Sequence, residues 1–413
     1  MTQRKKPELL LPARNAQVLR CAIRFGADAV YIGGEVFGLR AKAENFTLEE
    51  MKESIRFAHE AKAKVYVTVN ILARNGDLSG VRKYLSELSE IRPDGLIIAD
   101  PAVFMLAKEI CPTIPRHIST QANSTNYGTF RFWKELGASR VVTARELSLA
   151  EIKGIRDKTP DGPEIETFVH GAMCISYSGR CLLSNYFTGR DSNRGACTHP
   201  CRWNYAVAEA TRPGEYLPIE ENERGTFVFN SKDLCMIAHI PELVEAGIDS
   251  FKIEGRMKNA LYVANAARTY RRAIDDYFTD PALYRERLPY YEEEISHCAN
   301  RQFTTGFFFG RADETAQIYD AEAYRKDYTY LGPVLAVDEE KGLLMVQHNK
   351  FSVGETIEIM CPDGTDRKAL VRSIMTEDGI MRDSAPHAKE RVWVKTDETA
   401  EAGDILRREE VAG

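Results

Sequence analysis

The sequence has no apolar run long enough to cross a membrane, and no apolar export segment follows its charged start, Met1–Pro7. It also has no strong charge of either sign, because 55 Lys and Arg residues oppose 61 Asp and Glu residues, for a net charge of −6. A protein that coats nucleic acid through bulk charge is therefore excluded, although a local basic patch is not. These absences predict a cytoplasmic globular protein that does not bind membranes.

The sequence also gives no indication of disulfide-bonded cysteines. The nine cysteines are an odd number, and without an export signal they predict reduced thiols rather than a disulfide framework. Four are scattered and are expected to be structural, whereas the other five are clustered. The clustered cysteines are Cys174, Cys181, Cys197, Cys201 and Cys235.

Short apolar runs alternate with amphipathic segments through the first two thirds of the chain. Glycine-containing turns between a helix and the next run are typical of a parallel sheet. The count of eight runs, and the lack of a glycine-rich phosphate loop after the first, favour a closed (β/α)8 TIM-like barrel over an open doubly wound sheet. The predicted strands are Glu8–Ala13, Ala29–Gly33, Lys64–Asn70, Gly95–Asp100, Arg116–Ala122, Arg140–Glu146, Glu166–Ala172 and Asp249–Arg256.

A longer gap separates the seventh and eighth predicted strands. It predicts an insertion after strand seven, which carries the clustered cysteines and a β-hairpin formed by Asn204–Ala210 and Thr226–Asn230. Two helices, Tyr262–Phe278 and Leu283–Cys298, are expected to follow the barrel strands. From about Thr329 the pattern changes to alternating strands with turn dipeptides, which predicts a small C-terminal antiparallel β-barrel.

The chain is therefore predicted to form two domains. Residues 1–312 form the barrel, its cysteine loop (about 174–235) and the trailing helices. Residues 313–413 form a linker and the C-terminal β-barrel. Because the loops after the strands form the active-site face of a TIM-like barrel, the cysteine loop is expected to lie at the active site.

The cysteine spacing is Cys174-x6-Cys181-x15-Cys197-x3-Cys201, with Cys235 further along the chain. Four thiolates in a glycine-containing loop predict a site for zinc or for an iron–sulfur cluster. Zinc sites more often contain two tight Cys-x2-Cys pairs, but ligand softness alone leaves both metals open. The alternative is that these cysteines are small buried packing residues.

The residues around the first two clustered cysteines carry a longer pattern, Glu166-x-Phe168-x2-Gly171-Ala-Met-Cys174-x4-Gly179-x-Cys181-x-Leu183-Ser184. It resembles the signature of the collagenase-like peptidases, the thirty-second family of peptidases with unassigned mechanism. Four further segments, Leu11–Asn15, Gly26–Gly33, Ser119–Asn126 and Lys252–Arg256, resemble the same family, and the similarity spans about residues 8–310. The trailing β-barrel resembles the extra C-terminal domain of the tRNA-modifying branch.

The resemblance implies an oxygen-independent hydroxylase that forms 5-hydroxyuridine at the tRNA wobble position, with prephenate as co-substrate. It implies a 4Fe-4S cluster held by Cys174, Cys181, Cys197 and Cys201, with Cys235 as the alternative fourth ligand. The implied partners are tRNA, a small dicarboxylate and, because some relatives work as pairs, a second subunit of the same family. The C-terminal barrel is then expected to help hold the tRNA.

Four residues at the ends of predicted strands are candidate catalytic groups, because a barrel site recruits side chains there. Glu254 is predicted as an acid or base, Arg256 as a fork for a carboxylate or phosphate, and His170 as a proton shuttle. Gln121 is predicted to orient the substrate. The alternatives are a structural Glu254–Arg256 network, a hydrogen-bonded structural His170, and a Gln121 that caps the next helix.

Five further residues are predicted to bind substrate, three at the barrel mouth and two in the cysteine loop. They are Asn70, Arg145, Lys252, Arg180 and Arg194. The loop is basic between Gly179 and Trp203, with Asp191 as its only acid, which predicts a patch for RNA phosphate or a dicarboxylate.

Aromatic residues interleave with the basic residues of this loop. They are Tyr177, Tyr186, Phe187 and Trp203. Such a mixture predicts a surface on which a flipped base stacks, and the alternative is a solvated loop with buried aromatics.

Two other functions stay open on the residues alone. The first is a peptidase, as the family name says, although the sequence has no Ser–His–Asp order and no His-Glu-x-x-His motif. The second is a non-enzymatic RNA-binding module that uses a structural metal.

Overall fold

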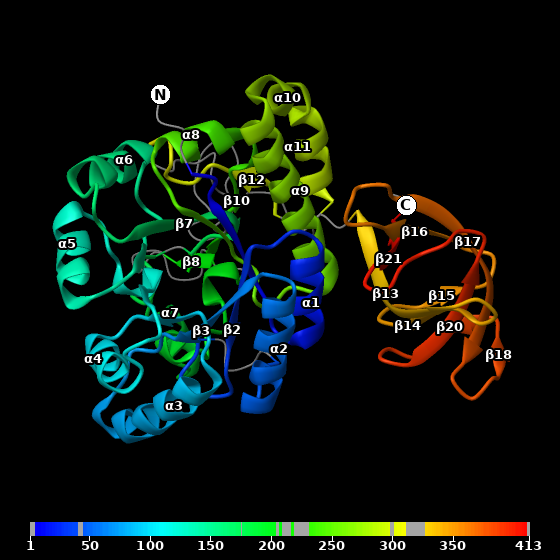
Figure 1. Cartoon of the computed structure of the whole chain (residues 1–413), viewed down its shortest axis with the longest axis horizontal. Helices are drawn as coiled ribbons and strands as arrows, with labels where there is room; N and C mark the ends of the chain where they lie inside the picture. The colour runs from blue at the N-terminus through cyan, green and yellow to red at the C-terminus, as the bar shows by residue number, and fades with distance from the viewer. Residues whose placement is uncertain are drawn as a thin grey trace.

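The computed structural model describes residues 5–39, 44–174, 176–203, 206–208, 216–218, 231–297, 301–310 and 327–410. Within these ranges, no helix is both long enough and apolar enough to cross a bilayer. Figure 1 shows a barrel wrapped by helices, with an all-β domain beside it.

Eight parallel strands form a closed ring, because the last of them, β11, pairs with both β7 and β1. In ring order the strands are β1 (Glu8–Pro12), β2 (Ala29–Gly33), β3 (Lys64–Val69), β4 (Gly95–Ile98), β5 (Arg116–Ile118), β6 (Arg140–Val142), β7 (Glu164–Ala172) and β11 (Ser250–Ile253). The surrounding helices are α1 (Ala16–Arg24), α2 (Leu48–Glu60), α3 (Leu78–Ile91), α4 (Pro101–Ile110), α5 (Tyr127–Leu136), α6 (Leu149–Lys158), α8 (Ile240–Glu245) and α9 (Ala260–Thr279). The predicted TIM-like barrel is confirmed.

Alternation along the strands divides the interior into two parts. In β2, Val30 and Ile32 face the helices and join the main core, whereas Tyr31 joins a small apolar cluster inside the barrel with Leu10 and Tyr66. Side chains at every second strand position therefore point toward the barrel axis. This alternation decides which residues can reach a site at the mouth of the barrel.

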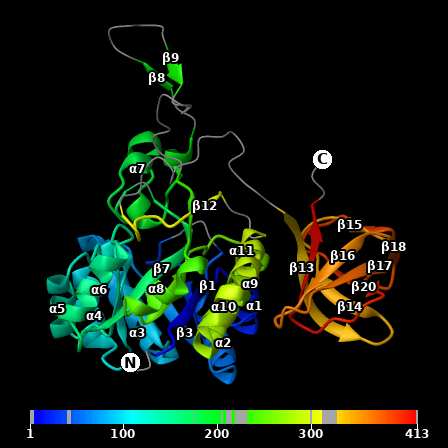
Figure 2. The same ribbon diagram turned by 90° about the horizontal axis from the view of Figure 1, so that it is seen from above.

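The insertion after β7 lies above one end of the barrel (Figure 2). It contains α7 (Leu183–Thr188), the hairpin of β8 (Ala206–Ala208) and β9 (Tyr216–Pro218), and β10 (Asp233–Cys235), which pairs with the end of β7. The strand β8 pairs with β9, and the other predicted hairpin strand, Thr226–Asn230, lies outside the described residues. Because β9 is closer to β8 along the chain than Thr226–Asn230 is, the hairpin loop is shorter and its closure costs less entropy.

The prediction of a single helix over Leu283–Cys298 is wrong, because the chain forms two helices, α10 (Pro281–Glu286) and α11 (Leu288–Ser296). Pro289 has no N–H to donate to the carbonyl four residues earlier, so a continuous helix would lose a hydrogen bond at that point. A short strand, β12 (Phe303–Thr304), follows and pairs with β10.

The C-terminal domain is a closed antiparallel barrel of six strands, with its own apolar core. In ring order these strands are β16 (Thr356–Met360), β21 (Ile405–Glu409), β13 (Tyr328–Asp338), β14 (Gly342–Val346), β20 (Arg391–Thr396) and β17 (Arg367–Thr376). Three short strands complete it, β15 (Phe351–Ser352), β18 (Met381–Arg382) and β19 (Ser384–Ala385). The predicted antiparallel β-barrel is confirmed.

A buried arginine joins the two domains. Arg268 on α9 donates to the two carboxylate oxygens of Asp366 at 2.5 and 3.0 Å, and to the backbone carbonyl of Cys361 at 2.8 Å. Arg407 donates to the same Asp366 carboxylate at 3.1 Å. Because buried charges are tolerated only with well-placed partners, this arrangement fixes the orientation of the C-terminal domain on α9.

A second set of buried charges lies inside the main barrel. Glu166 on β7 accepts from Nζ of Lys252 at 2.6 Å and from Nη1 of Arg140 at 2.9 Å. Arg140 also donates to Glu8 at 2.6 Å, so the network joins β1, β6, β7 and β11. Burial alone would raise the pKa of Glu166, but the charges of Lys252 and Arg140 outweigh it and hold that pKa below its usual value.

Replacing Glu166 with Gln is expected to lower the free energy of unfolding by about 3–5 kcal/mol, because the Lys252 ammonium would be buried without the carboxylate that it bonds. Urea unfolding followed by circular dichroism measures the change. The matched control is Glu109→Gln, which breaks an exposed ion pair with Arg82 and is expected to leave the unfolding midpoint nearly unchanged. An equal loss in both variants would contradict the structural role of Glu166.

Candidate active site

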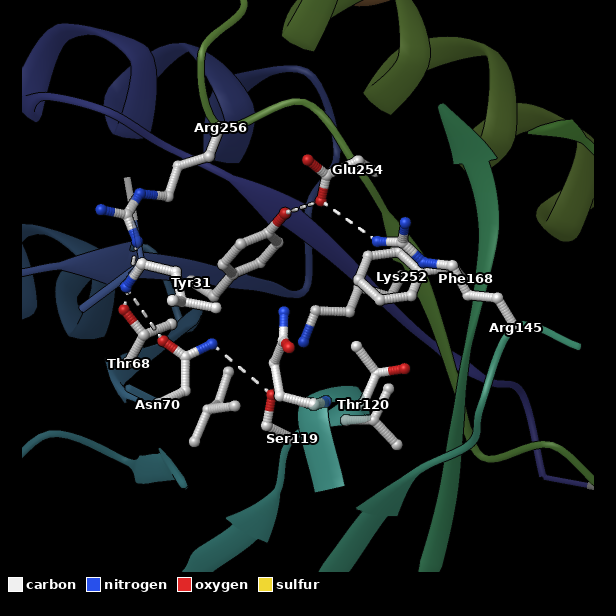
Figure 3. Close-up of a pocket in the computed structure, with 14 residues that line it drawn as sticks. Tyr31, Thr68, Asn70, Ser119, Thr120, Arg145, Phe168, Lys252, Glu254 and Arg256 are labelled. Atoms are coloured by element: carbon white, nitrogen blue, oxygen red, sulfur yellow. Dashed lines mark hydrogen bonds and ion pairs between the residues drawn. The ribbon is translucent and has the colours of Figure 1, made fainter. Parts of the chain in front are cut away.

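The carboxyl ends of the barrel strands surround a cavity (Figure 3), which is where a TIM-like barrel places its active site. Six of the predicted site residues line it. They are Asn70, Gln121, Arg145, Lys252, Glu254 and Arg256. These side chains come from three different strand ends and the turn after β5, and they bring three cations and one carboxylate into one space.

Glu254 supplies the carboxylate of the cavity. Its Oε2 lies 3.7 Å from Nη2 of Arg145 and accepts a hydrogen bond from the Tyr31 hydroxyl at 3.4 Å (Figure 3). The same hydroxyl lies 3.1 Å from the backbone carbonyl oxygen of Ile253. The carboxylate is thus held between a cation and a hydroxyl group, and its contact with the cation is long enough for an anionic ligand to compete for Arg145.

Arg145 links the cavity to the cysteine loop. Its Nη1 donates to the backbone carbonyl of Ala172 at 3.2 Å and lies 3.8 Å from Sγ of Cys174. The guanidinium carbon lies 4.1 Å from the centre of the Phe168 ring, so the side chain is also held by a cation–π contact. One guanidinium group therefore contacts both the cavity carboxylate and the first cysteine of the loop.

Arg256 is nearly fully buried at the opposite side of the cavity (Figure 3). It donates to Oγ1 of Thr68 at 3.2 Å and to Oδ1 of Asn45 at 2.7 Å. Gly33 makes room for it, because a Cβ at that position would lie 2.5 Å from the guanidinium carbon. A side chain at residue 33 would therefore displace the guanidinium group from the cavity.

Asn70 and Gln121 supply neutral hydrogen-bonding groups. Oδ1 of Asn70 accepts from the backbone N–H of Leu39 at 3.2 Å, and its Nδ2 lies 3.5 Å from Oγ of Ser119. Gln121 lies where the cysteine loop meets the barrel rim, and a Cβ on Gly179 would collide with its side-chain oxygen. Gly179, with φ of 75°, therefore allows the loop to approach the cavity closely.

His170 lies outside the cavity. The pairing of β7 with β11 shifts register near the end of β7, which turns His170 away from the interior that Phe168 faces. Its ring packs against Tyr262 and Tyr270 of α9, with ring centres 5.9 and 5.6 Å apart. Burial lowers the pKa of His170 to about 3, so the imidazole is neutral near pH 7 and packs in the core.

The two loop arginines predicted to bind substrate also lie outside the cavity. Arg194 donates to both carboxylate oxygens of Asp77 at 2.8 and 3.0 Å, whereas Arg180 is exposed to solvent. A second ion pair joins Asp191 of the loop to Arg74, at 3.4 Å. These pairs hold the cysteine loop to the segment between β3 and α3.

The four cysteines predicted to bind metal share the loop above the cavity, and none of them is buried. They are Cys174, Cys181, Cys197 and Cys201. The cysteines of the two apolar cores, in contrast, are buried, namely Cys21, Cys111 and Cys361. Within the described ranges, no three His, Cys, Asp or Glu side chains are arranged to hold a metal ion. The donor chemistry fits a thiolate-bound metal, and ligation requires the four thiols to approach one another.

Cys235, the alternative ligand, has a different environment. It lies on β10 and packs against the main core, with its Sγ 3.9 Å from the hydroxyl oxygen of Tyr270. Burial raises the pKa of Cys235 to about 11, which disfavours the thiolate that a metal needs. Cys235 therefore lies against the apolar core, whereas the four predicted ligands lie in the loop above the cavity.

Eight residues that line the cavity were not predicted as site residues. They are Tyr31, Leu39, Thr68, Ile97, Ser119, Thr120, Val142 and Phe168. Strand alternation carries the signal for two of them, because Tyr31 shares a face with Gly33 and Thr68 shares a face with Asn70.

Comparisons with known proteins agree with this architecture. The model of Peptidase family U32 matches residues 14–318, and that of the Peptidase family U32 C-terminal domain matches residues 326–407. The chain is 41% identical to tRNA hydroxylation protein P1 of Bacillus subtilis, over 98% of this chain and 95% of that protein. It is 39% identical to tRNA hydroxylation protein P of Escherichia coli, over 87% of each chain. It is also 38% identical to a 23S rRNA 5-hydroxycytidine synthase of Escherichia coli, over 65% of this chain and 39% of that protein.

In the metal-free protein, the four loop cysteines are expected to react with iodoacetamide at pH 8 well before Cys235. With a pKa of about 11, roughly one Cys235 thiol in a thousand is ionised at pH 8, and the thiolate is the reactive form. Mass spectrometry of peptides from a time course measures the order of modification. Cys21, whose pKa burial raises to about 12, is the internal control. Modification of Cys235 as fast as Cys174 would contradict its assigned environment.

Proposed function

Because this chain belongs to peptidase family U32 and has relatives named for RNA hydroxylation, we propose that it is a cytoplasmic iron–sulfur enzyme that hydroxylates the wobble uridine of tRNA to 5-hydroxyuridine, with prephenate as co-substrate. The observation that carries the proposal is the cavity of three cations and one carboxylate, which lies directly beside a loop with four unburied thiols. This arrangement suits a reaction in which a small acid is bound next to a redox group.

The cavity suits a small molecule with two carboxylates. Arg145, Lys252 and Arg256 line it together with one acidic side chain, Glu254. An arginine that meets a carboxylate can form two parallel hydrogen bonds, which adds both energy and orientation. Arg145 is suited to one ligand carboxylate because its contact with Glu254 is long, at 3.7 Å, and Arg256 on the other side is suited to the second.

Glu254 is proposed as the group that moves a proton at the substrate. A ligand carboxylate that pairs with Arg145 would replace the 3.7 Å contact of Arg145 with Glu254. The Tyr31 hydroxyl, at 3.4 Å, keeps the carboxylate in place when that happens. A base at the mouth of the barrel suits the loss of the C5 proton that hydroxylation of uracil requires.

The metal proposed for the loop is a 4Fe-4S cluster held by Cys174, Cys181, Cys197 and Cys201. Four thiolates are the usual ligand set for such a cluster, which supplies single electrons when bound. Two N–H groups already face these sulfur atoms. The backbone N–H of His199 lies 3.4 Å from Sγ of Cys197, and Nη1 of Arg145 lies 3.8 Å from Sγ of Cys174. Such donors tune the properties of a sulfur-bound metal.

Deletion of the gene is expected to remove 5-hydroxyuridine and its derivatives from tRNA, and the wild-type chain is expected to restore them. Mass spectrometry of tRNA nucleosides measures both. Cys174→Ala is expected to abolish restoration and to lower the iron content of anaerobically purified protein, because a four-thiolate site loses one ligand. Cys235→Ala is the matched control and is expected to restore the nucleoside. Glu254→Gln is expected to keep the iron and to slow formation by about 10²–10⁴-fold.

Three outcomes would contradict the proposal in different ways. Unchanged nucleosides with cleavage of casein would indicate the peptidase alternative. Unchanged nucleosides with tight tRNA binding would indicate a non-enzymatic RNA-binding module. A colourless, zinc-loaded protein with full activity would exclude the cluster while leaving RNA hydroxylation in place.

A further inference from the structure

A row of exposed aromatic side chains lies on the cysteine loop, outside the cavity. The aromatic patch consists of Tyr186, Phe187 and Trp203, with exposed fractions of 82, 46 and 45%, and Tyr177 of the same loop is 47% exposed. Tyr186 and Phe187 lie on α7 with ring centres 5.1 Å apart, and the ring of Trp203 lies 6.0 Å from that of Phe187. The alternative of a loop with buried aromatics does not hold for these four residues.

Exposed aromatic rings that adjoin one another indicate an interaction surface, because large apolar side chains are normally removed from water. Tyr186 and Phe187 lie on α7, which Figure 2 shows above one end of the barrel and which belongs to the same insertion as the four cysteines. The patch is therefore part of this insertion and not of the helices that surround the barrel.

The charges around the aromatic patch are those that attract a polyanion. Arg180 and Arg190 are exposed within the same loop. Asp191 is the only acid between Gly179 and Trp203, and it is already paired with Arg74. Aromatic rings with interspersed arginines are the combination that binds single-stranded nucleic acid, because the bases stack and the cations meet the phosphates.

The C-terminal domain carries the opposite charge. Residues 327–410 contain eleven Lys and Arg but eighteen Asp and Glu, a net charge of −7, which leaves +1 for the rest of the chain. The domain lies beside α9 and α1, away from α7 in both views (Figures 1 and 2). This balance gives the domain no net attraction for phosphate groups, so holding the tRNA backbone there would require a local cluster of its exposed cations.

We propose that the aromatic patch, with Arg180 and Arg190, binds unpaired RNA bases next to the base that enters the cavity, and that the C-terminal domain contributes no phosphate contacts. The identity of the RNA rests on the function proposed above, but the surface and its preference for unpaired bases do not. A protein partner on the same patch is the competing occupant.

The test compares binding of two RNA probes to the purified full chain by fluorescence anisotropy: a hairpin with an unpaired loop, and a fully paired duplex of equal length. Tyr186→Ala is expected to weaken hairpin binding about tenfold and to leave duplex binding and the salt dependence unchanged, because stacking is lost but no charge is. Arg180→Gln with Arg190→Gln is expected to lower the slope of log Kd against log salt by roughly 1–2.

Matched controls come from other exposed positions. Phe132→Ala and Lys134→Gln on α5 remove an exposed aromatic ring and an exposed cation far from the patch, and are expected to change nothing. Lys350→Gln with Lys395→Gln removes two exposed cations of the C-terminal domain and is expected to leave the salt slope unchanged. Tyr186→Phe keeps the ring and is expected to bind the hairpin as the wild type does.

Wild-type hairpin affinity in Tyr186→Ala would overturn the proposal, as would a reduced salt slope in the C-terminal double variant. A Tyr186→Phe variant as weak as Tyr186→Ala would also overturn it, because stacking would not then be the cause. Loss of a co-purifying protein from Tyr186→Ala, with RNA binding intact, would assign the patch to a protein partner. RNA binding that depends on the patch, in a protein that leaves tRNA nucleosides unchanged, would contradict the proposed function and not this inference.

Discussion

The site depends on one buried carboxylate, Glu166, which holds Lys252 and Arg140 inside the barrel. Each of these charges alone would be costly to bury, and together they are tolerated because every one has a partner at hydrogen-bonding distance. The pairing fixes Lys252 on the inner face of β11, and strand alternation then puts Glu254 on the same face, two residues nearer the mouth. A slip of one residue in this strand would break the ion pair and turn the cavity carboxylate outward, so the network defines the register that the site requires.

Arg145 makes the cavity and the cysteine loop parts of one structure. Its contacts with Glu254 and Cys174 use the same guanidinium group, so movement of that group toward a ligand changes both. By linkage, a ligand that binds better in one arrangement of the loop also stabilises that arrangement. The ion pairs of Arg194 with Asp77 and of Asp191 with Arg74 hold another part of the loop to the segment between β3 and α3.

The barrel was predictable because each strand-and-turn unit carries its own signal, and the position of the site followed from the rule that parallel strands end at one face. Asn70 and Glu254 were found in this way. His170 was misplaced because simple alternation puts it on the face of Phe168, whereas a register shift against β11 turns it toward α9, and such a shift depends on two strands at once. The partner of Arg194 comes from a segment more than a hundred residues away, which no local pattern reports. The break before α11 was readable in the sequence, since Pro289 cannot continue a helix.

The small net charge of the chain is distributed unequally between its two domains. The C-terminal domain alone carries −7, and the remainder is close to neutral, so the weak overall charge is the sum of unlike parts. The acidic domain is held to α9 by Asp366 between the buried guanidinium groups of Arg268 and Arg407, which fixes where its negative field lies. In the RNA binding proposed above, the polyanion gains no net attraction on that side and meets exposed arginines on the side of α7. Under this proposal, a negative field at one edge and stacking at the other orient an RNA over the cavity without a strongly basic surface, which is compatible with the net charge of −6.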